Sequence, residues 1–402
     1  MGGFWRLPDS QAGMKSRWPT RLLSAALVLW YGRLGFARRK PPAVVNRILV
    51  AHHLLLGDTV LLAPLLKKIR GRYPGAEVVM TCRAAYLSIF DMRPYGVSAI
   101  VFDPRDVRSF FELFRNRGFD LAILPGDNRF SWLARALDAR WVVAFNGDRS
   151  GYKNWLIDEF RDFPNRPMAL ADLMAEQLFD GPAPLPFALG EWRPPTARKF
   201  SLPEKPFWVF HLGARTPLRH WAPEKWRHLI QDVEKNGICP VLTSGPGEAH
   251  LITAVDLERR YRSYPGDLSL PQLWQLLSQA SLLICPDTGV AHLAKLIGVP
   301  TVVLYGPGST ALFGAGDFWR GARMIEVSLP AFPCRDQNLV FGRHVAWAGH
   351  CGRSSTQCAS ARCMAGISVG MVSSAVTDIV KAGENLTRSM PIRSGSGAIQ
   401  GD

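Results

Sequence analysis

The sequence lacks several patterns that would assign it to a class at once. Its most apolar stretch near the N-terminus, residues 22–31, is ten residues long, whereas a helix that crosses a bilayer needs about twenty. It has no zinc-finger or RNP pattern, no C-x-x-C pair and no Asp-x-Asp motif. These absences argue against a membrane-spanning protein, a nucleic-acid-binding module and a zinc ribbon, and we predict no metal site.

Acidic residues are scarce at the start of the chain. Residues 1–47 hold nine Lys or Arg and one Asp, which is over half of the net charge of +15. This imbalance favours an anionic partner such as membrane phospholipid, a phosphorylated glycan or a nucleotide. Leu23, Leu27, Trp30 and Leu34 share one helical face there. Such a helix either lies in a membrane interface or packs on the protein's own core, and both readings stay open.

Seven cysteines are few for 402 residues. Cys82, Cys239 and Cys285 lie in or beside apolar runs, as small buried hydrophobic residues do, which favours a reducing compartment. Four more cluster late in the chain, at positions 334, 351, 358 and 363. The sequence does not decide whether these four are paired or free.

The rest of the chain reads as two α/β units. Residues 43–180 alternate strand-like and helix-like runs, which predicts a parallel sheet covered on both faces. Residues 181–206 contain seven prolines and form the predicted linker, and residues 207–330 repeat the alternation. The cysteine-containing tail, 331–385, ends in a helical pattern. Residues 386–402, rich in Ser, Gly and Arg, are predicted to be disordered.

The most informative segment is Asp287-Thr-Gly-Val-Ala-His292. It follows an apolar run and opens a helical pattern that ends at Gly298-Val-Pro300. The free N–H groups and the positive dipole end of such a helix attract anionic ligands. This segment therefore predicts an anion site, although Asp and Thr are also ordinary helix caps.

Several motifs together resemble the lipopolysaccharide heptosyltransferases, glycosyltransferases of family 9 with the GT-B fold. The resemblance covers about residues 45–385 and rests on the order and spacing of its motifs. These are Gly57-Asp58 with the run to Pro74, Arg219-His220-Trp221 with Glu224-Lys-Trp226, Asp287-Thr-Gly-Val-Ala-His292 with Leu304-Tyr-Gly-Pro307, and Cys363-Met364 with Ile367 and Val372.

The resemblance implies two Rossmann-like domains that face each other across a cleft, with a C-terminal helix crossing back to the first. It implies a donor in the second domain, an acceptor in the first, and transfer with inversion onto a lipid-linked or phosphorylated glycan of the lipopolysaccharide core. The donor would be a nucleotide sugar, with ADP-heptose the leading candidate. We expect a peripheral enzyme on the inner face of the cytoplasmic membrane, with residues 1–42 at the anionic surface.

Roles for individual residues follow from the chemistry of inverting transfer. Asp58 is the predicted base for the acceptor hydroxyl. With no Asp-x-Asp motif to hold a metal, protein groups must hold the diphosphate, so we expect a metal-independent enzyme without cofactors. The residues predicted to bind the donor or substrate are Gly57, Arg219, Glu248, Asp287, Thr288, Gly289 and His292.

Two other functions compete with transfer. A nucleotide-sugar epimerase of GT-B-like fold would act on the donor alone and need no lipid acceptor. A non-catalytic glycan-binding protein at the membrane surface would keep the fold without transfer. The segments Gly308–Asp317 and Pro125–Asn128 depart from the family pattern, which leaves the donor sugar and its base open.

Overall fold

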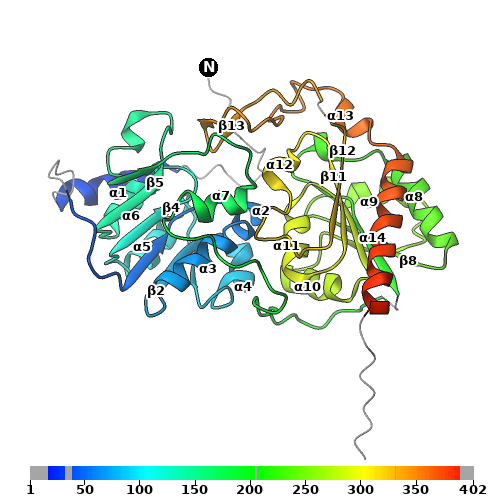
Figure 1. Ribbon diagram of the computed structural model, residues 1–402, viewed down its shortest axis with the longest axis horizontal. Helices are drawn as coiled ribbons and strands as arrows, with labels where there is room; N and C mark the ends of the chain where they lie inside the picture. The colour runs from blue at the N-terminus through cyan, green and yellow to red at the C-terminus, as the bar shows by residue number, and fades with distance from the viewer. Residues whose placement is uncertain (1–16, 32–38, 204–205, 331, 390–402) are drawn as a thin grey trace, which may run out of the picture.

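The computed structural model describes residues 17–31, 39–203, 206–330 and 332–389. Two α/β units lie side by side, one at each end of the long axis (Figure 1). The first is built on a six-stranded sheet with the order β3-β2-β1-β4-β5-β6, and every pairing in it is parallel. Its strands are β1 (Arg47–Val50), β2 (Glu77–Cys82), β3 (Ser98–Val101), β4 (Leu121–Leu124), β5 (Trp141–Phe145) and β6 (Glu159–Arg161).

The second unit repeats this arrangement. Its parallel sheet has the order β12-β11-β10-β7-β8-β9, which is the same strand order counted from β7. This is the doubly wound Rossmann order, with its switch point beside the first strand of each sheet. The two Rossmann-like domains confirm the predicted fold. The strands are β7 (Phe207–His211), β8 (Cys239–Ser244), β9 (Arg262–Pro265), β10 (Leu282–Pro286), β11 (Thr301–Tyr305) and β12 (Met324–Ser328).

Helices connect and cover the strands, as the alternating pattern predicts. In the first unit they are α1 (Trp18–Trp30), α2 (Leu56–Val60), α3 (Ala63–Arg72), η1 (Ala84–Tyr86), α4 (Leu87–Phe90), α5 (Val107–Phe114), α6 (Phe130–Ala136), η2 (Gly151–Lys153) and α7 (Leu170–Glu176). In the second they are η3 (Pro217–Arg219), α8 (Pro223–Lys235), α9 (Ala249–Val255), α10 (Leu270–Gln279), α11 (Gly289–Ile297), α12 (Thr310–Phe313), α13 (Arg362–Ala365) and α14 (Val369–Ser389).

Local sequence explains several of these boundaries. Ser269 and Gln272 form a capping box at the start of α10. Gly298 ends α11 in the left-handed conformation, with φ of 83°, which glycine adopts without strain. The run that begins at Gly57-Asp58 is divided between two helices, α2 and α3. The backbone turns at Leu61 and Leu62, and Pro64 in the first turn of α3 cannot donate to a continuous helix.

Helix α1 buries one face against the first unit. Thr20, Ser24 and Val28 are buried at helical spacing, and the helix packs on α6 and α5. Trp18 and Trp30 remain exposed on the other side. The helix therefore packs on the protein's own core and still presents an apolar outer face. Within the described residues, no helix combines the length and the apolar character needed to cross a bilayer.

The predicted return of the last helix to the first domain is wrong. Helix α14 lies on the second unit, where its apolar face, including Val372 and Val376, packs against β11, β12 and α8 (Figure 1). It also extends to Ser389, beyond the predicted boundary at residue 385. The rest of the predicted disordered tail, residues 390–402, lies outside the described residues.

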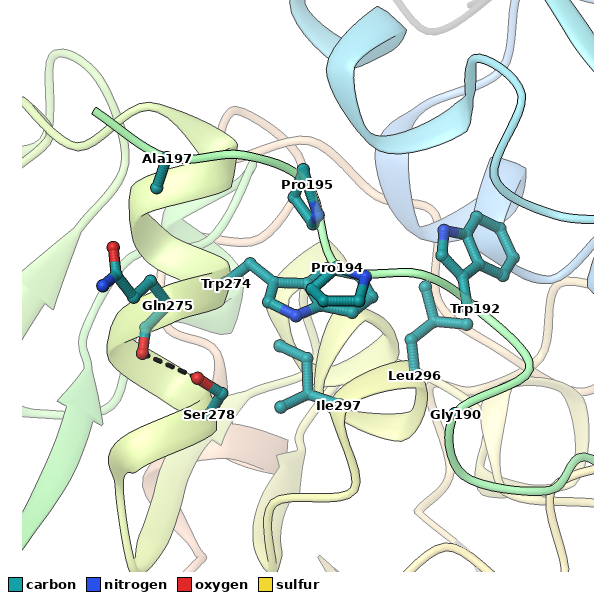
Figure 2. A pocket seen from close by; sticks show the side chains of 10 residues that line it. All are labelled: Gly190, Trp192, Pro194, Pro195, Ala197, Trp274, Gln275, Ser278, Leu296 and Ile297. Atoms are coloured by element: carbon teal, nitrogen blue, oxygen red, sulfur yellow. Dashed lines mark hydrogen bonds between the residues drawn. The ribbon is translucent and has the colours of Figure 1, made fainter. Parts of the chain in front are cut away.

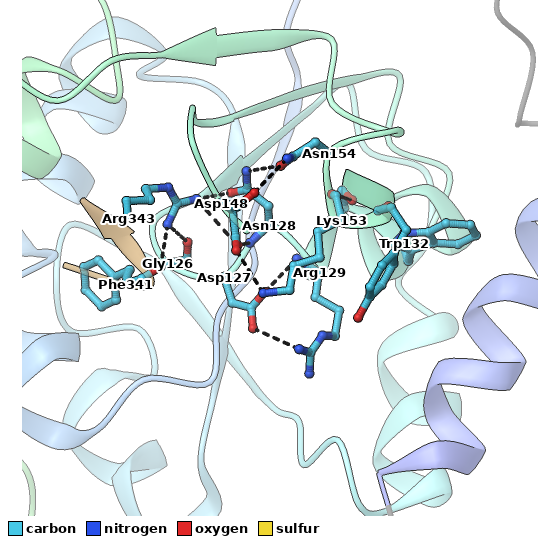
Figure 3. Close-up of polar contacts among 12 residues, drawn as sticks. Gly126, Asp127, Asn128, Arg129, Trp132, Asp148, Lys153, Asn154, Phe341 and Arg343 are labelled. Carbon is cyan, nitrogen blue, oxygen red and sulfur yellow. Dashed lines mark hydrogen bonds and ion pairs between the residues drawn. The ribbon is translucent and has the colours of Figure 1, made fainter. Parts of the chain in front are cut away.

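The segment that does cross is the tail that precedes α13. It contains the short hairpin of β13 (Leu339–Val340) and β14 (Arg343–His344). Arg335 donates to the carbonyls of Tyr305 and Gly306 in the second unit. Arg343 is buried in the first unit, where it donates to the carbonyls of Gly126, Phe145 and Asn146 (Figure 3 shows its contacts). None of the seven cysteines, which all lie within the described residues, forms a disulfide; Cys82 and Cys285 are buried as predicted, whereas Cys239 is exposed.

Candidate active site

The predicted site residues gather where the two switch points face each other. Asp58 lies in α2, directly after β1 at the switch point of the first sheet. Arg219 follows β7 and Asp287 follows β10, which flank the switch point of the second sheet. Helix α2 packs against α11, so the two edges meet. Open α/β sheets bind ligands at such carboxyl ends.

The two units approach most closely at a pair of glycines. A methyl group built on Gly57 would lie 2.8 Å from Cδ2 of His292 and 3.2 Å from Cα of Gly289. One built on Gly289 would lie 3.2 Å from the backbone nitrogen of Gly57. The predicted binding residues Gly57 and Gly289 therefore let α2 lie against the N-terminus of α11, which brings Asp58 toward the second unit.

Asp58 has the electrostatic setting of a base. Burial raises the pKa of its carboxyl to about 6, although Arg219 and Arg215 act to lower it. Asp287 adds a smaller raising effect. A carboxylate with a pKa near 6 is mostly ionised at neutral pH and is still basic enough to accept a proton from a hydroxyl. Its cationic and anionic neighbours come largely from the second unit, so the side chain faces the junction of the two.

Arg219 contacts Asp287 at both its backbone and its side chain. Nη1 of Arg219 donates to the backbone carbonyl of Asp287 over 2.8 Å and lies 3.1 Å from Oδ2 of its carboxylate. This second contact is an ion pair without hydrogen-bond geometry, and Oδ2 has no hydrogen-bond partner. Asp287 is 3% exposed. The arginine is thus fixed at the end of β10 with donors left for a ligand.

His292 is buried one turn into α11. Burial holds the pKa of its imidazole well below the usual value, with smaller effects from Lys295 and Arg219. It is therefore neutral, and its Nδ1 atom has no partner. A neutral ring can still donate one hydrogen bond to a phosphate but brings no charge. Thr288 and Gly289 begin the same helix, and the Thr288 side chain makes no capping bond.

Glu248 lies over the loops that follow β7 and β8. Its Oε2 accepts from the N–H of Gly245 over 2.9 Å, and Oε1 lies 3.8 Å from Nε2 of His220. Burial alone would raise the pKa of Glu248, but the contacts with His220 and the Gly245 N–H lower it. The carboxylate is thus ionised at the carboxyl ends of β7 and β8, and its role with a ribose stays a prediction.

Three residues of the site were missed by the sequence analysis. Arg83 follows β2 and donates to the carbonyls of Leu54 and His53, which fixes the loop that leads to Asp58. Tyr86 and Arg215 are electrostatic neighbours of Asp58 from either side of the junction. The available signal was position, because Arg83 and Arg215 both follow predicted strands at their carboxyl ends.

A hollow in the described surface lies apart from these residues. A groove of about 450 Å³ separates the proline-rich linker from α10 and α11. Figure 2 shows Trp192, Pro194 and Pro195 on the linker side and Trp274 on α10. Its lining residues include no charged side chain. It therefore lacks the charged groups that would bind a diphosphate or accept a proton.

Comparison with known proteins decides the family. The model of "Glycosyltransferase family 9 (heptosyltransferase)" matches residues 107–341, more than half of the chain. The protein belongs to glycosyltransferase family 9. It is therefore a glycosyltransferase. The family match leaves out residues 1–106, so it covers Arg219, Asp287 and His292 but not Asp58.

Individual relatives agree with this assignment. Lipopolysaccharide heptosyltransferase 1 of Pseudomonas aeruginosa is 25% identical over 322 residues, 73% of this chain and 88% of the relative. The solved ADP-heptose lipopolysaccharide heptosyltransferase II of Escherichia coli is 17% identical, with a TM-score of 0.64 over 84% of this chain and 99% of that one.

A third similar structure is TibC from enterotoxigenic Escherichia coli, described as an iron-containing dodecameric glycosyltransferase. It is 14% identical to this chain, with a TM-score of 0.52 over 84% of this chain and 77% of its own. At these identities the two solved structures support the fold alone.

Proposed function

We propose that this family 9 enzyme is an inverting, metal-independent transferase that moves a sugar from a nucleotide sugar to a lipopolysaccharide core or related envelope glycan. The relatives' names support a heptose carried on ADP. The observation that carries the proposal is the meeting of Asp58 from the first unit with Arg219, Arg215 and Asp287 from the second. A base and a set of leaving-group contacts thus come from opposite units.

Asp58 accepts the proton of the acceptor hydroxyl as its oxygen attacks the anomeric carbon. The base and the diphosphate site belong to facing units, so the hydroxyl attacks from the face opposite the leaving diphosphate. Attack from that face inverts the configuration of the anomeric carbon. General-base catalysis of this kind contributes about 10²- to 10⁴-fold to a rate. The raised pKa of Asp58 matches the task.

The departing diphosphate lies at the second switch point. Arg219 supplies charge, the N–H groups of Thr288 and Gly289 point from the start of α11, and His292 donates a neutral hydrogen bond. Glu248 holds the ribose. This set replaces the divalent ion that many other transferases use, which is why we propose that the reaction needs no metal.

We also propose the division of labour along the chain. Residues 43–180 bind the acceptor, 207–330 bind the donor, and residues 181–206 link them. The enzyme acts at the inner face of the cytoplasmic membrane, and the outer face of α1, with Trp18 and Trp30 exposed, faces the lipid.

The test is Asp58→Asn. We expect kcat to fall by about 10²- to 10⁴-fold, while binding of ADP-heptose, followed by thermal shift, stays close to that of the unaltered protein. Asp232→Asn on the exposed side of α8 is the matched control and should keep full turnover. Near-normal turnover of Asp58→Asn would remove this residue from the role of base.

The same assay separates the competing functions. An epimerase would convert ADP-heptose to an isomer without an acceptor, which nuclear magnetic resonance detects directly. A non-catalytic glycan-binding protein would release no nucleotide with any acceptor. We expect neither result. Nuclear magnetic resonance of the product would also show inversion at the anomeric carbon, and retention there would contradict the mechanism.

A further inference from the structure

Cationic residues follow neighbouring strands of the first sheet at their carboxyl ends. Arg105 follows β3, Arg83 follows β2, and Arg129 precedes α6 just after β4. Because parallel strands end at one edge of a sheet, these three arginines gather along the edge that carries Asp58. All three are partly exposed and so remain reachable from solvent.

Helix α1 brings two more arginines to this edge. Its Thr20 hydroxyl donates to the carbonyl of Pro104, in the loop between β3 and α5. The helix then runs across α6. Arg17 and Arg21 therefore lie at the end of α1 nearest the sheet edge. We call Arg17, Arg21, Arg83, Arg105 and Arg129 the arginine cluster.

The electrostatics of neighbouring groups agree with this geometry. The pKa of Arg17 is lowered mainly by burial. The neighbouring charges of Arg105, Arg129 and Arg83 lower it further. Burial lowers the pKa of His53, at the end of β1, to about 3, with Arg83, Arg17 and Arg105 adding to the effect. Arg17, Arg83, Arg105 and Arg129 thus lie close enough to influence one another, and Arg83 also influences Asp58.

Two carboxylates of the described residues, Asp127 and Asp103, lie beside the cluster. Asp127 lies 3.8 Å from Arg129 and 3.2 Å from Lys153, so it is shared between two cations. Figure 3 shows Asp127 and Arg129 beside the buried Asp148 and Arg343. Asp103 accepts from the backbone N–H of Arg105. In the part of the chain that the structure describes, no carboxylate lies within 4.0 Å of the guanidinium groups of Arg17 or Arg21.

We propose that the arginine cluster binds an anionic group, a phosphate or a carboxylate, on the acceptor saccharide, and that α1 is part of the acceptor site. This inference rests on the proposed function, because Asp58 marks where the acceptor hydroxyl lies. Guanidinium groups bind phosphate and carboxylate through paired N–H donors, which fixes orientation as well as position. The cluster then holds the acceptor with its hydroxyl toward Asp58.

The surface beside the cluster fits an acceptor that is anchored in a membrane. The outer side of α1 carries four apolar side chains that are 59–86% exposed: Trp18, Leu22, Leu29 and Trp30. Trp155 is 69% exposed. The ring of Trp155 packs against the ring of Trp132 in α6, the helix against which α1 packs. An aromatic surface that borders cations suits the lipid–water boundary. One helix thus contributes both to the lipid-facing surface and to the anionic subsite.

The test is the double variant Arg17→Ala/Arg21→Ala. The acceptor is heptose-deficient lipopolysaccharide in non-ionic detergent micelles without phospholipid, and the donor is ADP-heptose. We expect the acceptor KM to rise about tenfold, while kcat and the donor KM stay within about twofold. The acceptor KM of the unaltered enzyme should also rise with salt more steeply than that of the variant. Arg17→Lys/Arg21→Lys should recover part of the loss.

The matched control removes two positive charges from the opposite edge of the same sheet. Arg72 ends α3 and Arg140 precedes β5, so Arg72→Ala/Arg140→Ala changes the net charge equally at a distance from Asp58. It should leave the acceptor KM unchanged. An equal rise in both double variants would show a general charge effect and overturn the subsite.

Other outcomes are equally decisive. If Arg17→Ala/Arg21→Ala keeps the normal acceptor KM in micelles but loses binding to phosphatidylglycerol vesicles, the arginines bind lipid headgroups and the proposal is wrong. If the unaltered enzyme transfers sugar and the variant matches it, the subsite fails while the proposed function stands. If the unaltered enzyme transfers nothing to this acceptor, the proposed function fails, and the subsite fails with it.

Discussion

The contact between Gly57 and α11 offers the most direct test of how the two units cooperate. A methyl group added in Gly57→Ala would lie 2.8 Å from Cδ2 of His292, whereas carbon atoms rest about 3.5–4.0 Å apart. The two helices must therefore separate by roughly 0.7 Å or more. His292 is buried and cannot turn away freely. Asp58, the next residue, moves with Gly57.

A shift of this size is small for folding and large for chemistry. Overpacking of this kind costs about 1–3 kcal/mol of unfolding free energy, whereas a misplacement near 1 Å can cost about 100-fold in rate. We expect Gly57→Ala to lower kcat by about 10- to 100-fold, with a much smaller change in ADP-heptose affinity. Steady-state kinetics with both substrates measures the first, and isothermal calorimetry measures the second.

Gly71→Ala is the matched control. No atom lies within 4 Å of the methyl group it would add, and alanine in a helix is more stable than glycine by about 0.5–1 kcal/mol. It should keep full activity and melt slightly higher. Normal kcat in Gly57→Ala would refute the reasoning, because it would mean that turnover does not require the close contact of α2 with α11.

Three further predictions follow from the site and the crossing segment. Because burial raises the pKa of Asp58 to about 6, kcat/KM should fall about tenfold per pH unit below pH 6; activity that is constant down to pH 5 would contradict this. Treatment with EDTA should leave activity unchanged, and a loss that Mg²⁺ restores would disprove metal independence. Arg343→Leu leaves buried carbonyls without a donor and should cost about 3–5 kcal/mol of unfolding free energy, measured by thermal denaturation, whereas Arg353→Leu at the surface should change it little.

The architecture and the central motif could be predicted from the sequence. Buried parallel strands are short apolar runs, and helices follow them at fixed spacing, so Arg47–Val50 and Leu282–Pro286 could be located without a structure. The pairs Gly57-Asp58 and Asp287-Thr288 follow such strands directly. Their chemistry is local, because the free N–H groups at the start of a helix and the polar side chains beside them come from neighbouring residues.

Which groups from distant segments meet could be learned only from the folded protein. Periodicity could not show that Arg83, Tyr86 and Arg215 surround Asp58, because their proximity depends on how the two sheets face each other. Nor could it place Arg343, which lies in a tail with little regular structure. Its acceptors in the first unit are 197 to 217 residues away in sequence. The packing of α14 on the second sheet likewise depends on an apolar face whose partner the sequence does not name. Local patterns are set by neighbouring residues, whereas these contacts are set by the free energy of burying whole surfaces.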